Sequence, residues 1–345
     1  MDNWPRAALP LPSMRVAFHI GDPLTDGVAA IALSWVRQLS MQYPEDRYVV
    51  LSEYPLPDPV DRLSKGSFAW IVLPRRFPLF PFWSDAIFFH KLSLFKPDVF
   101  ISTYPDKPVF ARCKQARVTA KAGLATDSNE TSFAPLLSSH YTVLNTDQKL
   151  AIKEEWSLGR EYFMLTGPLP SESMLTLLLQ AFSLFKHRQQ SGLKLLLPFS
   201  LSGRYPVLAS KIDQYKYRQS LVITGSIAAE QVAQLTGAAY ALLSVGSPGA
   251  ALLASAQSWR VGVPLLTLPD LDLSCLTQDS VLFASEPTKE ALATIMMQIY
   301  KDESLRLALI RQGQRCLSAA DAPFVTASIR TSLQQLITGA ATVGA

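Results

Sequence analysis

The residues best placed to do chemistry form a short loop, Gly246–Gly249, with the sequence Gly-Ser-Pro-Gly. The segment before it, 239–244, is an apolar run typical of a buried strand, and the segment after it, 250–259, is a small-residue run typical of a helix. A glycine-rich turn between a strand and a helix collects backbone N–H groups at the positive end of the helix dipole. Such a turn attracts anions such as phosphate. Many α/β proteins carry it without a ligand, so a structural role stays open.

The loop lies in a stretch without charged residues, between Glu230 and Arg260. A continuous apolar stretch of this length can span a membrane. The Gly246–Gly249 loop interrupts it, however, and glutamines such as Gln257 occur near its ends. We therefore interpret it as a strand, loop and helix of a buried α/β unit.

The elements around the loop predict two doubly wound halves that face a cleft, in the α/β class. The first half opens with a strand at 15–20, a helix at 28–41 and a strand at 47–51. The second half restarts the same alternation with a strand at 162–166 and an amphipathic helix at 173–188. The remaining expected strands are 68–73, 99–102, 117–120, 141–144, 193–197, 221–224, 265–268 and 281–283, and the remaining expected helices are 145–156, 205–217, 228–236, 288–300, 303–317 and 327–337.

A chain of 345 residues exceeds the usual size of one core, which predicts two domains. Glycine and proline concentrate between positions 156 and 169, and we expect the linker there. The predicted division is 1–160 for the first domain, 161–337 for the second, and 338–345 for a tail.

Composition narrows the function classes. Hydrophobic residues make up 48% of the chain and charged residues 17%, as in folded globular proteins. The net charge of +4 is mild and no dense basic cluster occurs, so we expect no nucleic-acid partner. Three scattered cysteines, Cys113, Cys275 and Cys316, favour a reducing compartment over a disulfide framework or metal cage. No signal-peptide pattern opens the sequence, so a cytoplasmic protein without metal or resident cofactor is expected.

One segment, Pro74–Phe95, is unusually aromatic and has basic residues in and beside it, among them Arg75 and Lys96. It fits a peripheral contact with the inner face of the membrane or with a lipid-linked acceptor. It fits better a loop and a helix that packs its apolar side chains on the sheet. We expect the packing role.

The second half resembles the carboxy-terminal domain of family-four retaining glycosyltransferases of the GT-B fold, from Tyr162 to about Ile337. The similarity rests on the order of YFMLTG, LLLQAFSLF, LKLLL, VITGSIAAEQVAQL, AYALLSV and the helix that ends at Gly-Val-Pro, 262–264. The first half is similar more faintly, through Asp26-Gly27-Val28 and through Lys96-Pro97-Asp98-Val99. The resemblance implies transfer of a sugar from a nucleotide-diphosphate donor to a glycan or lipid-linked acceptor, with retention, as in polysaccharide biosynthesis.

The resemblance also implies a donor site, since a leaving diphosphate needs electrostatic stabilisation. Backbone amides of the glycine-rich loop would face the diphosphate, one arginine would supply positive charge, and one glutamine would contact the ribose. Gly27 would approach the donor from the first domain. The donor-site residues expected in this way are Gly27, Arg204, Gly246, Ser247, Gly249, Ala250 and Gln257.

The sequence departs from the family at the charged positions. The two glutamates of the family fall at Gly249 and Gln257, so both carboxylates are absent. The expected lysine is missing from 170–173, and the expected first-domain histidine is missing from 118–122. His19 ends the first strand and is expected to be structural. The catalytic residues therefore stay unassigned.

Two functions remain open at this point. The chain is either an active glycosyltransferase with an altered donor site or a catalytically degenerate relative that acts as a partner or binding subunit. A dinucleotide-dependent enzyme is disfavoured, because no Gly-x-Gly-x-x-Gly follows the first strand.

Overall fold

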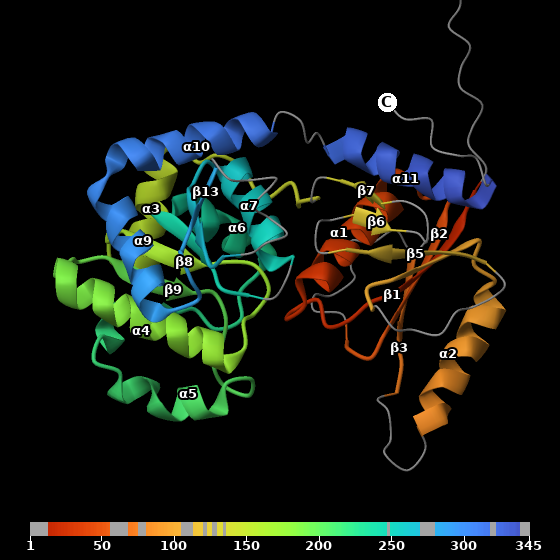
Figure 1. Ribbon diagram of the computed structural model, residues 1–345, viewed down its shortest axis with the longest axis horizontal. Coiled ribbons are helices and arrows are strands. Elements are labelled where there is room, and N and C mark those ends of the chain that lie inside the picture. The colour runs from red at the N-terminus through yellow and green to blue at the C-terminus, as the bar shows by residue number, and fades with distance from the viewer. Residues whose placement is uncertain are drawn as a thin grey trace, which may run out of the picture.

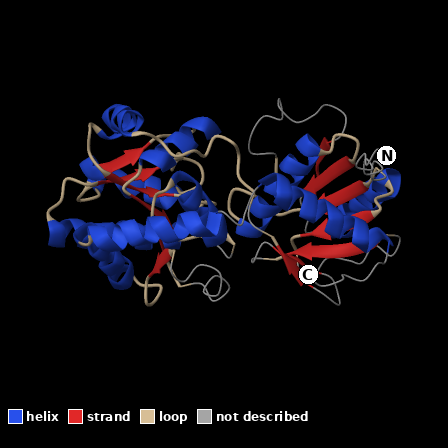
Figure 2. Ribbon diagram, turned by 90° about the horizontal axis from the view of Figure 1, so that it is seen from above, coloured by secondary structure: helices blue, strands red, loops and turns tan. Residues whose placement is uncertain are grey.

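Two sheets, one in each half of the chain, organise the computed structural model of this protein (Figure 1). Seen from above, the two sheets form separate lobes, each with its strands enclosed by helices (Figure 2). The fold is α/β with two doubly wound units, as the sequence predicted. The structure describes residues 13–55, 68–74, 81–104, 113–119, 123–125, 130–133, 136–246, 249–269, 280–317 and 322–338.

The first sheet has seven strands in the order β3-β2-β1-β4-β5-β6-β7. Strands β1 to β5 are parallel, and β6 and β7 add an antiparallel edge. The strand order reverses between β1 and β4, so the loop after β1 opens at the switch point where α/β proteins bind ligands. The strands are β1 (Arg15–His19), β2 (Arg47–Ser52), β3 (Phe68–Val72), β4 (Val99–Ser102), β5 (Lys114–Val118), β6 (Gly123–Ala125) and β7 (Glu130–Ser132).

The second sheet has six parallel strands in the order β10-β9-β8-β11-β12-β13. Its switch point lies between β8 and β11, so the loops that follow these two strands sit side by side. The glycine-rich loop is one of them. The strands are β8 (Tyr162–Leu165), β9 (Lys194–Leu197), β10 (Leu221–Ile223), β11 (Ala241–Ser244), β12 (Leu265–Thr267) and β13 (Val281–Phe283).

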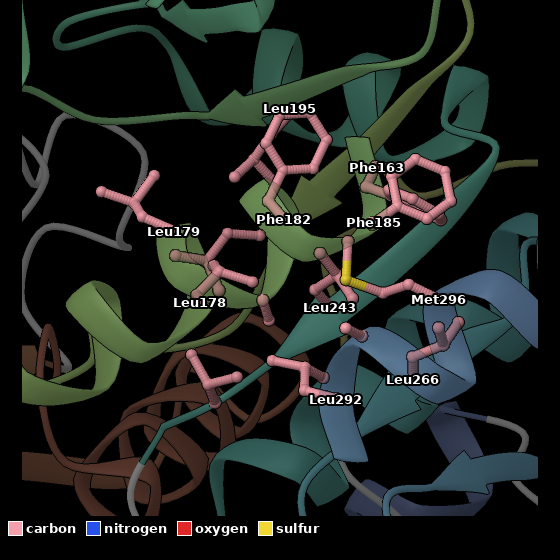
Figure 3. Close-up of a cluster of buried hydrophobic side chains, with 14 of the residues drawn as sticks. Phe163, Leu178, Leu179, Phe182, Phe185, Leu195, Leu243, Leu266, Leu292 and Met296 are labelled. Atoms are coloured by element: carbon pink, nitrogen blue, oxygen red, sulfur yellow. The ribbon is translucent and has the colours of Figure 1, made fainter. Parts of the chain in front are cut away.

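Helices cover both sheets. In the second lobe, helix α4 turns Leu178, Phe182 and Phe185 onto the sheet, where they meet Phe163 and Leu195 in a fully buried cluster (Figure 3). The helices are α1 (Gly27–Gln42), α2 (Pro81–Phe95), α3 (Thr146–Ser157), α4 (Glu172–Gln189), α5 (Pro206–Lys211), α6 (Ala229–Ala238), α7 (Ala250–Val261), α9 (Lys289–Lys301), α10 (Glu303–Leu317) and α11 (Ala322–Thr338).

Two helices near the predicted domain limits pack across them. Helix α3 places Ile152 and Trp156 against the core of the second lobe, although the predicted division assigns it to the first domain. Helix α11 places Ile329 and Leu333 in the core of the first lobe, although the division assigns it to the second domain. Figure 1 shows α11 above the lobe of β1 and β2, apart from α10. The domain boundaries stay a prediction. Each of these two helices packs on the lobe opposite to the one that the predicted division gives it.

A buried ion pair holds α11 in place. The Arg330 side chain is 5% exposed and donates from Nε to Asp46 Oδ2 at 2.8 Å, and Asp46 is fully buried. Arg330 also contacts Glu45 at 3.0 Å and lies over the Tyr43 ring at 4.2 Å. Asp46 accepts two further hydrogen bonds, from the Met14 amide and the Tyr48 hydroxyl. This network ties the last helix to the turn before β2.

Most expected elements are confirmed within one to three residues. Helices α3 and α9 are capped by Asn145 and Thr288, whose side chains accept hydrogen bonds from the amides of Gln148 and Ala291. The expected strand at 141–144 is wrong: this segment packs along α6, where the Leu144 side chain meets Gly237, and pairs with no strand among the described residues. The expected helix at 205–217 is shorter, since α5 covers only Pro206–Lys211 and two 3₁₀ turns follow it. The edge strands β6 and β7 were not predicted.

The packing interpretation of the aromatic segment is confirmed for its described part. Phe88 and Leu92 of α2 are buried against Phe100 of β4, and Ile87 and Phe95 are partly buried beside them. Residues 75–80 lie outside the described residues. Within the described chain, no helix combines the length and the apolar character that crossing a bilayer requires.

Candidate functional site

The candidate site lies where the switch points of the two sheets meet. We call this contact the seam. On one side is the loop after β1 with the start of α1, residues 21–28. On the other side are the loop after β8 (166–170), the loop after β9 with Arg204, and the start of α7 (249–252). The seam brings together Gly27, Arg204, Gly249 and Ala250.

The closest contact in the seam joins two backbones. Gly249 has a left-handed backbone (φ 79°), and a methyl group on its α-carbon would lie 3.2 Å from both the carbonyl carbon of Gly27 and the amide nitrogen of Val28. Contacts this short between a Cβ and a backbone are rare, so any side chain at this position would strain its own backbone and push the neighbouring backbone away. The amino ends of α1 and α7 therefore abut directly at the place where the sequence predicted a diphosphate.

Apolar packing continues this contact along both helices. Ala251 and Leu252, in the first turn of α7, are buried in the hydrophobic core of the first lobe together with Ile31 of α1. The side chains in the first turn of α7 are therefore part of the other lobe's core. The expectation that the backbone amides of this turn face a ligand stays a prediction.

Arg204, the expected cation, is engaged across the seam. Its Nη1 and Nη2 atoms donate to Asp22 Oδ2 at 3.3 and 3.4 Å. The Asp22 side chain is 11% exposed and the Arg204 side chain 37%. Nearby, the Leu169 amide donates to the Leu24 carbonyl at 2.5 Å, which ties the loop after β8 to the loop after β1. The positive charge is thus matched by a carboxylate from the opposite lobe.

Gln257, the expected ribose contact, faces the protein interior. The residue is 8% exposed. Its Oε1 accepts from Thr166 Oγ1 at 2.5 Å, and its Nε2 donates to the Tyr141 hydroxyl at 3.0 Å. Burial raises the pKa of Tyr141 to about 12, so this phenol stays neutral at physiological pH. Both ends of the amide are occupied by protein groups, which gives Gln257 a structural role in this conformation.

Two carboxyl groups, Asp22 and Asp26, lie at the amino end of α1. Asp26 caps the helix by accepting from the Val28 amide at 2.9 Å. Burial raises the Asp26 pKa, and the nearby Asp22 raises it further. Tyr104 lies close by, and burial together with neighbouring acidic groups such as Glu53 raises its pKa to about 12. An anion at this end of α1 would meet negative charge and a helix end that already has a capping acceptor.

The glycine-rich loop itself is only partly described. Gly246 is exposed and lies against Pro168 and Ala250, whereas Ser247 falls outside the described residues. Just before the loop, the Ser244 hydroxyl is buried and has no hydrogen-bond partner among the described residues. His19 at the end of β1 is also fully buried, between the rings of Phe88 and Tyr104 at centroid distances of 5.0 and 4.7 Å.

Several residues of the seam were missed in the sequence. Asp22, Leu24 and Thr166 form its polar contacts, and Tyr141 completes the environment of Gln257. Asp22 follows one predicted central strand and Thr166 is the last residue of another, and side chains at these positions reach a switch point. These positions were the available signal for both. Tyr141 gave no signal, because it belongs to a segment predicted as a strand.

Comparison with known proteins gives a match at the level of fold. No family model matches the sequence, and no curated protein matches it either. Among solved structures, WaaG, a glycosyltransferase involved in lipopolysaccharide biosynthesis, matches with a TM-score of 0.67 at 12% identity, over 94% of this chain and 100% of its own. Anabaena HepE, solved in complex with UDP and glucose, matches with a TM-score of 0.68 at 9% identity, over 93% of this chain and 100% of its own.

The same fold also occurs in a UDP-N-acetylglucosamine 2-epimerase, which matches with a TM-score of 0.52 at 12% identity, over 87% of this chain and 91% of its own. The chain therefore has the two-lobed architecture of GT-B glycosyltransferases. At these identities the likeness establishes the fold, and the reaction has to be argued from the site.

Proposed function

We propose that this protein is a catalytically degenerate relative of the GT-B glycosyltransferases that acts as a partner or binding subunit. The single observation that carries this proposal is the backbone contact between Gly249 and Gly27. It lies beside the loop where the resemblance puts a donor diphosphate, and a side chain at the position of the first family glutamate would force the neighbouring backbone to shift.

The charges of the seam support the same proposal. A nucleotide-diphosphate donor needs positive groups where the leaving diphosphate gains charge. Arg204 is already paired with Asp22, and the Asp26 carboxyl group lies at the amino end of α1. Binding a diphosphate here would require breaking the ion pair and placing an anion beside two carboxyl groups. Breaking the ion pair costs only about 0.2–1 kcal/mol. Most of the unfavourable free energy would come from placing the anion beside the carboxyl groups.

An active retaining transferase is the second candidate, in which a nucleotide sugar is the donor and a glycan or lipid-linked molecule the acceptor. Two observations favour it. The fold is shared with HepE, which was solved with UDP and glucose, and the unpartnered Ser244 hydroxyl lies directly before the glycine-rich loop. For transfer to occur, the lobes would have to separate at the seam and expose the amino end of α7.

A donor-cleavage assay separates the two candidates. The purified chain is incubated with UDP-glucose, UDP-N-acetylglucosamine, GDP-mannose or ADP-glucose, and release of the nucleoside diphosphate is followed by a coupled assay. The degenerate role predicts release no faster than without protein. Release that scales with protein concentration and is lost in an Arg204→Ala variant would support the active transferase instead.

A cytoplasmic location and a role in polysaccharide biosynthesis remain part of the proposal. We also propose a peripheral membrane contact through Pro74–Phe95, since Leu94 is 67% exposed and Lys91 and Lys96 are exposed on or next to α2. Exposed apolar and basic groups on one helix favour anionic lipid surfaces. Sedimentation with vesicles of phosphatidylglycerol, compared with phosphatidylcholine, tests this contact.

A further inference from the structure

Helix α3 carries an outward face that the fold does not use. Leu150 and Glu154 are four residues apart, which places them along one side of the helix, and Leu158 is the residue that ends it. Leu150 is 57% exposed and Leu158 is 75% exposed, and Val143 just before the helix is 62% exposed. Asp147 and Glu155 flank this side and are exposed as well. We call these six residues the α3 face.

Charge is segregated across the helix. The lysines of α3 point toward the body of the protein: the Lys153 side chain is 13% exposed and binds Glu161 at 2.6 Å, and Lys149 is half-buried near Arg306. The acids point outward, and Asp147, Glu154 and Glu155 form no ion pair within the described part of the chain. The α3 face is therefore apolar and acidic, although the whole chain carries a net charge of +4.

Two features at the carboxyl end of α3 are unfavourable for the stability of the helix itself. Glu154 and Glu155 lie in the last turn, which has no basic residue, so their charges add to the negative end of the helix dipole. Leu158 ends the helix with a left-handed backbone (φ 56°), a conformation that glycine or asparagine adopts with less strain. Burial does not explain this leucine, because most of its surface is exposed.

Residues that are unfavourable for the local structure and do not stabilise the fold are often found at functional sites, where binding explains why they are present. We propose that the α3 face is a docking surface for a basic amphipathic segment of a partner protein. Apolar side chains of the partner would cover Leu150 and Leu158. Its lysine or arginine side chains would pair with Glu154 and Glu155 at the negative end of the helix dipole.

This inference rests on the proposed role as a partner subunit and names the surface that such a role would use. The acidic character of the α3 face argues against anionic lipid as its occupant, since like charges repel. The surface lies on the second lobe, and its use does not require the seam to open.

The test uses the full chain and two fluorescein-labelled helical peptides of 18 residues. The first peptide is built from leucine and lysine, and the second has glutamate at every lysine position. Fluorescence anisotropy should show binding of the lysine peptide and not of the glutamate peptide. A Leu150→Ser/Leu158→Gly double variant should lose at least tenfold in affinity. Val207→Ser, a matched change at another exposed apolar residue (57% exposed), should bind as the unchanged chain does.

Two further measurements keep the result interpretable. The single variant Leu158→Gly should raise the melting temperature by relieving the left-handed strain, while it weakens peptide binding, so a folding defect cannot explain the loss. Hydrogen exchange should show protection by the lysine peptide over residues 143–158. Protection elsewhere, equal binding of both peptides, or full affinity in the double variant would overturn the proposal.

Self-association is a separate outcome. If sedimentation equilibrium shows that the chain dimerises alone, and that the double variant is monomeric, a second copy occupies the α3 face and the proposed partner class is wrong. Failure of docking leaves the proposed loss of transfer untouched, because the donor-cleavage assay measures that without any peptide.

Discussion

Gly249 and Gly27 meet backbone to backbone at the seam between the two lobes, so closely that a methyl group on the α-carbon of Gly249 would lie 3.2 Å from the Gly27 carbonyl carbon. The contact joins the amino ends of α7 and α1, the two helices that begin at the switch points of the two sheets. The sequence predicted a diphosphate beside the glycine-rich loop, so the closeness of the two backbones is what the proposed loss of donor binding rests on.

The seam contact makes Gly249 sensitive to the smallest substitution. Gly249→Ala should lower the free energy of unfolding by about 2–4 kcal/mol, because left-handed strain of about 1 kcal/mol adds to a backbone clash of about 1–3 kcal/mol. Gly225→Ala is the matched control, since Gly225 has a similar backbone (φ 74°) with no neighbour within 4 Å of the added group. It should lose about 1 kcal/mol. Urea denaturation of both variants measures the difference, and equal losses would mean that the seam does not hold Gly249 tightly.

Gln257 should behave as a structural residue. Gln257→Leu removes both polar atoms and leaves the hydroxyl groups of Thr166 and Tyr141 without their bonds to the amide. The expected loss of unfolding free energy is about 1–3 kcal/mol, as for other buried hydrogen-bonding groups that lose a partner. Chemical denaturation measures it. A variant as stable as the unchanged chain would show that the amide is free to serve a ligand.

The ion pair across the seam should contribute little. Asp22 and Arg204 are partly exposed, and pairs of this kind couple by about 0.2–1 kcal/mol. A double-mutant cycle with Asp22→Ala and Arg204→Ala should give a coupling free energy in this range at low salt. The coupling should fall toward zero in 1 M salt, where the Debye length is about 3 Å. A coupling that does not change with salt would place the pair in a drier environment than the structure indicates.

The buried pair of Arg330 and Asp46 should contribute far more. Arg330→Met leaves the Asp46 carboxylate buried without its cation and should cost about 3–5 kcal/mol. Arg188→Met, a matched change of an exposed arginine on α4, should stay within about 0.5 kcal/mol. Thermal unfolding compares the two variants. A loss as small as that of Arg188→Met would show that α11 is held by its apolar contacts alone.

The doubly wound fold could be predicted from the sequence because its central strands are buried on both faces. Tyr162–Leu165 and Ala241–Ser244 are examples of nearly continuous apolar runs. Such runs are typical of strands in a parallel sheet that is covered on both faces. The edge strands β6 and β7 have three residues each, too few for any period to emerge. The segment at 141–144 resembles a strand in composition, yet it packs on a helix. Its conformation depends on tertiary contacts, which the local sequence pattern does not predict.

The seam could be predicted only in part. The glycine-rich loop and Gly27 were identified because glycine at a strand-to-helix turn permits close approach. What approaches could not be read from the sequence, since the contact partner of Gly249 lies more than 200 positions away. The pairing of Arg204 with Asp22 and the inward orientation of Gln257 likewise depend on how the two lobes and their loops meet.

The most direct test of the central claim is equilibrium binding of nucleotides to the unchanged chain. Melting temperature is measured against rising concentrations of UDP, GDP and ADP and of their common sugars, with a UDP-binding protein as positive control. A ligand at 100 times its dissociation constant adds about 2.7 kcal/mol to the free energy of unfolding, which is readily detected. A closed seam predicts flat curves up to millimolar concentrations. A concentration-dependent rise with one nucleotide, abolished by Arg204→Ala, would contradict the account and restore the seam as a donor site.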